Sequence, residues 1–152
     1  MRIKTDAHQR DFDPAVNWIS GLIGAAVDKR VAAFEAQERR NPLLATHFRD
    51  TYDLEFALAK ARKYRKSRGR LPTGEEYTPL FGFLVPAQRI HAALPQEARV
   101  AFEGRLRDAL NGAYGARPLA YEINVATHLM HKGWDVEFAD YSGAARFDHR
   151  AG

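Results

Sequence analysis

The segment 118–148 constrains the fold most, because its residue pattern predicts three elements in a fixed order. Residues 118–132 show the apolar spacing of an amphipathic helix, with a proline in the first turn and Gly133 at the end. Apolar and polar residues alternate over 134–138, which is typical of a strand with one buried face. A turn and a second short strand at 145–148 follow, so we expect the helix to be followed by an antiparallel β-hairpin.

Glu122 is the residue of this helix that ordinary folding does not explain. At 100° per residue it lies about 20° from Leu129 and about 40° from Ala126, so the pattern places it at the centre of the apolar face. A buried carboxylate is costly unless it finds a cation, a metal ion, a hydrogen-bond donor or a proton. The alternative is a glutamate at the margin of the face, which reaches solvent or pairs with Arg117 or Arg146.

Asp148 is the second acid of interest, at the end of the second expected strand. Alternation in the hairpin puts it on the same face as Arg146 and opposite Phe147. In that position it comes within reach of the helix that carries Glu122. The alternative is a polar residue at the frayed end of the strand.

This succession of elements resembles the opening of the PD-(D/E)xK phosphodiesterase core, which defines the restriction-endonuclease-like superfamily. The features that carry the resemblance are the inward helix glutamate, the glycine, the strand WDVEF, the turn and the tripeptide RFD. The resemblance covers residues 118–148. It implies that Glu122 and Asp148 are catalytic carboxylates that help to hold a divalent metal ion, Mg²⁺. It also implies a following strand with an acid-x-lysine pair, whose acid binds the same metal and whose lysine assists the attacking water.

No acid-x-lysine pair follows Asp148, where only residues 149–152 remain, and Phe147 stands before it in place of a proline. We therefore expect a truncated core that binds Mg²⁺ weakly or not at all and is inactive alone. We also expect the second strand to present an exposed edge, which would allow self-association with another chain.

The region before this segment reads as mainly helical. Asp13-Pro14 and Asn41-Pro42 are helix starts, and the apolar spacing after each predicts a long helix, one over 14–40 and one to about residue 66. These two helices should form a hairpin. Pro86 and Pro95 are expected to open two further helices, the second of which ends at Asn111-Gly112.

A run of seven cations without an acid occupies the end of the second expected helix and the residues after it. Phosphate contact in a nucleic acid is one interpretation, and a solvated helix end stabilised by the helix dipole is the other. The run consists of Lys60, Arg62, Lys63, Arg65, Lys66, Arg68 and Arg70. His128 and His131 lie on the polar face of the 118–132 helix, so we do not expect them to be metal ligands.

The composition narrows the class of protein. The chain has 152 residues, no cysteine and a formal net charge of +4, so it excludes disulfides and thiolate metal sites and mildly favours a polyanionic partner. It shows no apolar run near the ~20 residues that span a bilayer and no secretory leader, so we expect no membrane partner and a cytoplasmic location.

The sequence therefore predicts a mainly α protein with a short C-terminal β-hairpin. Residues 1–114 form the helical region, and residues 115–152 form an incomplete αββ core of the nuclease-like type. The first functional hypothesis is a truncated or degenerate member of a Mg²⁺-dependent nuclease family. The alternative is a helical module that binds protein or nucleic acid without catalysis.

Overall fold

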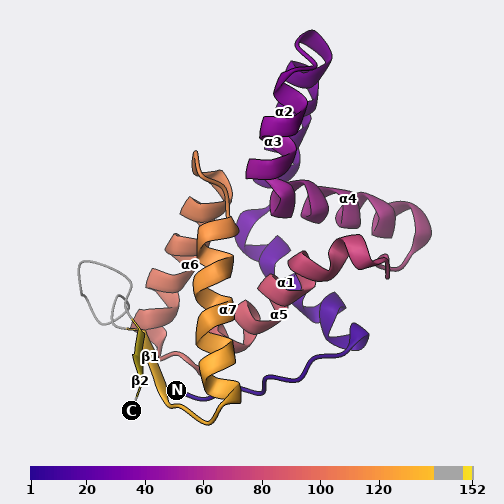
Figure 1. Cartoon of the computed structure of the whole chain (residues 1–152). Helices are drawn as coiled ribbons and strands as arrows, with labels where there is room; N and C mark the ends of the chain where they lie inside the picture. Colours follow the sequence, from indigo (N-terminus) through magenta and orange to yellow (C-terminus); the bar gives the residue numbers. More distant parts are fainter. Residues whose placement is uncertain (139–148, 152) are drawn as a thin grey trace.

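The chain is mainly helical and ends in a two-stranded antiparallel sheet, in a computed structural model that describes residues 1–138 and the backbone of 149–151 (Figure 1). The mainly helical class is thus confirmed. The helices are α1 (Phe12–Ile23), α2 (Ala26–Arg40), α3 (Leu44–Thr51), α4 (Asp53–Arg68), α5 (Thr78–Ala93), α6 (Gln96–Asn111) and α7 (Arg117–His131). Short 3₁₀ turns, η1 (Gln9–Asp11) and η2 (Glu75–Tyr77), precede α1 and α5. None of the described helices is long and apolar enough to cross a membrane.

The long helix expected over 14–40 is broken at Gly24, so that prediction was wrong. Gly24 ends α1 with a φ of 56°, a conformation that costs a side-chain-bearing residue far more than a glycine. Its N–H donates to the carbonyl of Ser20 at 3.0 Å, and α2 begins two residues later, at Ala26. The break lets α2 leave the direction of α1 and form an arm with α3 that stands out from the rest of the chain (Figure 1).

The second long helix is also broken, at Tyr52, which separates α3 from α4. The Tyr52 ring stacks on Phe34 of α2 with 4.4 Å between centroids, and its hydroxyl donates to the Ala113 carbonyl at 2.7 Å. These contacts to distant parts of the chain hold Tyr52 in a non-helical conformation, with φ −117° and ψ 31°. The expected hairpin is nevertheless present, since α2 packs against both α3 and α4.

Pro86 was expected to open a helix, but it lies inside α5. A proline inside a helix removes one backbone hydrogen bond and costs about 3 kcal/mol. Its neighbours Leu84, Val85 and Ile90 are almost fully buried, and each is worth about 1.5–3 kcal/mol of burial. Because α5 is the central helix of the core, packing outweighs the local signal. Pro95 directly precedes α6, as expected.

The core joins the two ranges separated by the expected boundary at residue 114. Helix α5 packs against α1, α4, α6 and α7, and one hydrophobic cluster runs from Phe12 to Phe138. The boundary itself falls in the loop between α6 and α7. Residues before and after the boundary therefore share a single core.

The C-terminal sheet follows α7 in the expected order. Gly133, with a φ of 93°, lies just after α7 and precedes β1 (Val136–Phe138). β1 pairs antiparallel with β2 (His149–Ala151), with Val136 opposite Ala151 and Phe138 opposite His149. The second strand expected at 145–148, and Asp148 with it, lies outside the described residues.

Candidate nucleic-acid interface

Three of the seven cations of the basic run are tied to the fold by ion pairs. Arg62 pairs with Asp28 of α2 at 3.3 Å and donates to the Gly24 carbonyl at 2.7 Å. Arg65 pairs with Asp13 of α1 at 3.4 Å and donates to the side chain of Asn17 at 2.8 Å. Lys60 pairs with Glu76 of η2 at 3.0 Å, although both side chains are largely exposed. These cations help to position α4 against α1, α2 and η2.

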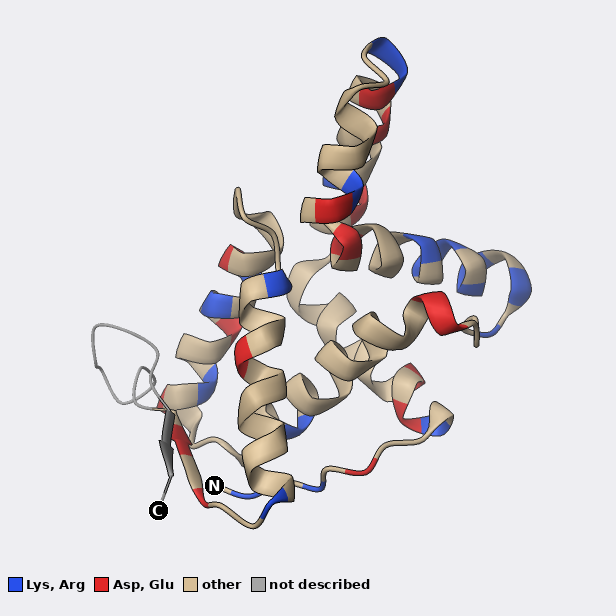
Figure 2. Cartoon of the chain, viewed as in Figure 1, with Lys and Arg blue, Asp and Glu red and all other residues tan. Residues whose placement is uncertain are grey.

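The other four cations, Lys63, Lys66, Arg68 and Arg70, are exposed, and none has an acid partner among the described residues. The guanidinium of Arg68 lies over the ring of Tyr64, 5.7 Å from its centroid. Figure 2 shows the cations gathered along α4 towards its C-terminal end. We call these four residues the α4 basic end. They compensate the negative pole of the helix and leave positive charge facing solvent.

A groove of about 920 Å³ lies between α2 and α4, and the basic run forms much of one wall. Its cations include Lys63 and Lys66, which are exposed and have no acid partner in the described part of the chain. Its aromatic side chains offer little free ring surface. Phe56 is 8% exposed with the Arg49 guanidinium 3.9 Å from its ring centroid, and Tyr77 is 5% exposed. The groove therefore offers charge rather than a stacking surface.

Glu122 does not lie at the centre of the buried face of α7, and that prediction was wrong. The buried face centres on Ile123, which is about 100° round the helix from Glu122. The Glu122 side chain is 33% exposed, and its Oε2 accepts a hydrogen bond from Arg105 of α6 at 2.6 Å. Arg117, the partner considered from the sequence, pairs instead with Asp53 of α4 at 2.9 Å.

The metal site predicted from Glu122 and Asp148 stays a prediction, because Asp148 lies outside the described residues. Within residues 1–138, no cluster of three or more histidines or acids is placed to hold a metal ion. Glu122 alone is a poor fit to Mg²⁺, which takes several oxygen ligands, since a guanidinium already occupies one of its oxygens.

Glu55 of α4 is the buried acid that the sequence interpretation overlooked. Its side chain is 0% exposed, and its Oε1 accepts a hydrogen bond from the Ala116 backbone N–H at 3.1 Å. Its Oε2 is buried without a hydrogen-bond partner in the described part of the chain. Burial raises the pKa of Glu55 to about 7, against the opposing effects of the Ala116 hydrogen bond and of Arg30. On a helical wheel Glu55 falls between Leu58 and Tyr52, so the test applied to Glu122 would have found it.

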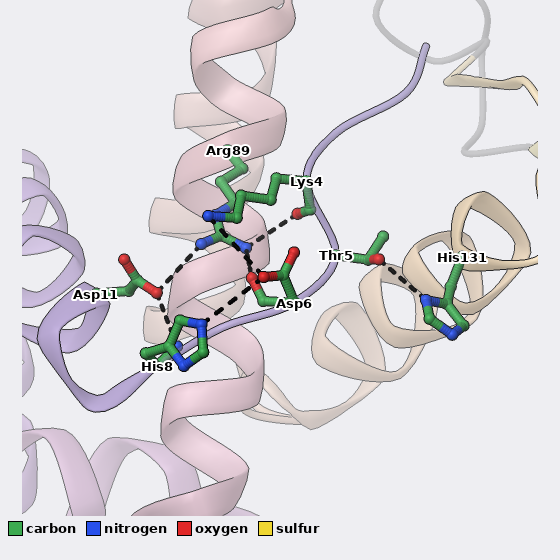
Figure 3. Close-up of polar contacts among 7 residues, drawn as sticks. All are labelled: Lys4, Thr5, Asp6, His8, Asp11, Arg89 and His131. Atoms are coloured by element: carbon green, nitrogen blue, oxygen red, sulfur yellow. Dashed lines mark hydrogen bonds and ion pairs between the residues drawn. The ribbon is translucent and has the colours of Figure 1, made fainter.

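A second polar cluster ties the N-terminal segment to α5 and α7 (Figure 3). Arg89 of α5 donates to the backbone carbonyls of Lys4 at 2.9 Å and Asp6 at 2.6 Å, and it pairs with Asp11 at 3.3 Å. His131 of α7 shares a hydrogen bond of 3.0 Å with the Thr5 hydroxyl. These residues hold an extended segment against the body. Their contacts are accounted for by that packing.

Comparison of the chain with known protein families, with curated proteins and with solved structures finds no match.

Proposed function

We propose that the chain is a helical nucleic-acid-binding module that contacts the sugar–phosphate backbone through the α4 basic end. The observation that carries the proposal is the division of the basic run. Lys60, Arg62 and Arg65 bind side chains of neighbouring elements and so help to position α4. The other four, Lys63, Lys66, Arg68 and Arg70, are exposed and have no acid partner among the described residues. Cations of this kind supply the sequence-independent part of nucleic-acid affinity. The net charge of +4 adds long-range attraction to a polyanion.

The proposal has a measurable consequence in salt. Each phosphate that a cation neutralises releases bound counterions, so the slope of log K against log salt is about −0.9 per contact on a DNA duplex. Four contacts from the α4 basic end give a slope of about −3.6. Removing two of the four should bring the slope to about −1.8 and weaken binding most at low salt.

The test is binding of a fluorescent mixed-sequence duplex, followed by anisotropy across a salt series. The variant Lys63→Gln/Lys66→Gln removes two cations from the α4 basic end. The matched control Arg39→Gln/Arg40→Gln removes two exposed cations from the last turn of α2 and so lowers the net charge by the same amount. We expect the first variant to lose affinity and slope and the control to bind nearly as the parent does. Equal losses would show attraction by net charge alone, and absence of binding in the parent would refute the function.

A second candidate is a nuclease of the PD-(D/E)xK type, and one observation favours it. The order α7, β1, β2, with antiparallel strands after a glycine, agrees with the αββ opening of that core. The site that this candidate needs, Glu122 and Asp148 around Mg²⁺, is the part that stays a prediction. We expect no Mg²⁺-dependent cleavage of plasmid DNA by the purified chain. Cleavage that disappears in Glu122→Ala would reverse that expectation and favour the nuclease over the binding module.

A further inference from the structure

A set of polar contacts fastens α2 and α4 to the loop between α6 and α7. Arg30 of α2 donates to the carbonyls of Leu110 at 2.7 Å and Gly112 at 2.5 Å, at the end of α6. Tyr52, just before α4, donates to the Ala113 carbonyl at 2.7 Å. These bonds connect residues that are 61 or more positions apart in the chain. We call this contact region the α4–α7 seam.

Glu55 occupies the centre of the seam, at the first turn of α7. Its Oε1 accepts the Ala116 N–H at 3.1 Å and so caps α7 from another helix. Gly115 passes so close that a Cβ there would lie 3.0 Å from Glu55 Oε2 and 2.6 Å from the Thr51 carbonyl oxygen. Oε2 has no donor within reach in the described part of the chain, and the side chain has no exposed surface. A charge on this carboxyl group is therefore only half compensated.

We propose that Glu55 is a proton-operated latch: its neutral carboxyl group holds α4 against the first turn of α7, and loss of the proton loosens the seam. An ionised carboxylate in this position keeps one desolvated oxygen without a hydrogen bond, and local opening of the seam would return water to that oxygen. The latch joins the helix that carries the α4 basic end to the helix that carries Glu122. It thus controls how α4 and α7 are placed relative to each other. The latch is independent of the proposed nucleic-acid binding.

The charges around Glu55 act in both directions, and burial decides the balance. The Arg30 guanidinium and the Ala116 N–H favour the ionised form, while Asp53 on the same helix opposes it. Asp53 is itself paired with Arg117 of α7, which moderates its effect. Desolvation is the largest influence and raises the pKa of Glu55 from 4.5 to about 7. The carboxyl group therefore changes charge near neutral pH, where an exposed glutamate is already ionised.

The size of the effect follows from linkage between opening and titration. If the opened seam restores the ordinary pKa of 4.5 and the closed seam keeps a value of about 7, opening becomes about 70-fold more favourable between pH 5 and pH 8. The Ala116 amide reports this directly, because its hydrogen bond to Glu55 breaks when the seam opens.

The experiment is amide hydrogen exchange by NMR on the full chain at pH 5 and pH 8, with each rate corrected for the intrinsic effect of pH. We expect the protection factor of the Ala116 amide to fall about 70-fold in the parent. In Glu55→Gln it should not change with pH, because the amide side chain keeps the acceptor oxygen and does not titrate. The Leu94 amide, bonded to the Ile90 carbonyl at the end of α5, is the internal control and should be unaffected in both proteins.

A second measurement keeps the proposal testable if the variant folds poorly. The side-chain carboxyl carbon of Glu55 can be followed by NMR in the parent chain as pH is raised, and its midpoint should lie near 7. A midpoint near 4.5 would overturn the latch. So would protection of Ala116 that is independent of pH in the parent, or a pH dependence that persists in Glu55→Gln.

Discussion

Gly115 offers a direct test of how closely the α4–α7 seam is packed. Replacing it with alanine adds a Cβ that would lie 2.6 Å from the Thr51 carbonyl oxygen and 3.2 Å from Cδ1 of Tyr52. The first of these contacts is with backbone, which cannot rotate away as a flexible side chain does. Gly115 also has a φ of 70°, a left-handed conformation that alanine adopts at a cost. We therefore expect Gly115→Ala to destabilise the fold markedly.

The magnitude has two parts of different origin. The left-handed conformation costs a non-glycine residue about 1–2 kcal/mol. Forcing a methyl group into filled space costs about 1–3 kcal/mol more, since α4 or the loop must shift. Alanine recovers about 0.4–1 kcal/mol by reducing the conformational freedom of the unfolded chain. The net loss in the free energy of unfolding should be about 1–5 kcal/mol.

Gly69 provides the matched control. It ends α4 with a φ of 75°, and a Cβ added there would meet nothing within 4 Å. Gly69→Ala therefore carries the conformational cost and the unfolded-state gain but no steric cost. The difference between the two variants isolates the packing of the seam, which we expect to be worth about 1–3 kcal/mol.

The assay is urea denaturation of the parent and both variants, followed by far-ultraviolet circular dichroism. The midpoint should fall more in Gly115→Ala than in Gly69→Ala, with similar slopes for all three proteins, because the surface exposed on unfolding is nearly the same. Equal shifts in the two variants would refute the reasoning, since they would mean that the seam has room for a methyl group. A fall in slope for Gly115→Ala alone would mean that the seam opens before the rest of the fold.

Three further predictions concern other charged contacts. The raised pKa of Glu55 means that the folded state retains its proton more strongly than the unfolded chain, so the stability it contributes is fully present below pH 4.5 and is lost as pH rises through about 7. Between pH 5 and pH 8 the free energy of unfolding should fall by about 2.5 kcal/mol, and this fall should be absent from the denaturation midpoints of Glu55→Gln. The side chains of the pair Arg105–Glu122 are about one-third exposed, so their coupling free energy should be at most about 1 kcal/mol. A double-mutant cycle with glutamine at either position measures this coupling. A larger value would indicate that the pair is shielded from solvent more than its exposure suggests. Arg89→Ala removes the two hydrogen bonds to the carbonyls of Lys4 and Asp6, so limited proteolysis should cut the N-terminal segment faster than in the parent, whereas unchanged cleavage would mean that the remaining contacts of the segment retain it.

Local signals in the sequence predicted most helix positions. A proline in the first turn of α7, Pro95 before α6 and Gly69 at the end of α4 act through φ preferences and backbone hydrogen bonding within a few residues. The strand β1 after α7 was predictable for the same reason, because Gly133 follows the helix and alternation marks a strand. Two of the failures were local rules overridden by contacts from far along the chain. Tyr52 breaks a helix because Phe34 and Ala113 hold it, and Pro86 is tolerated because α5 is buried.

The candidate sites divide in the same way. The basic run was evident from the sequence, because charge does not depend on packing to be recognised. The sequence did not show which of these cations remain without an acid partner, because that depends on acids such as Asp28 and Glu76 on other elements. A helical wheel orders residues around the helix axis but does not say which direction faces the core. For this reason Glu122 was wrongly placed at the centre of the buried face of α7.

The sequence by itself determined the mainly helical class, the succession of α7 and β1, and the concentration of positive charge at the end of α4. Tertiary structure alone decided the chemistry of the acids, because the pKa and the partner of a carboxyl group depend on what packs around it. Glu55 is buried by a loop 61 residues away, and Glu122 is satisfied by an arginine from the preceding helix. Helix α7, which carries Glu122, thus begins at a seam whose more unusual acid is Glu55 on α4.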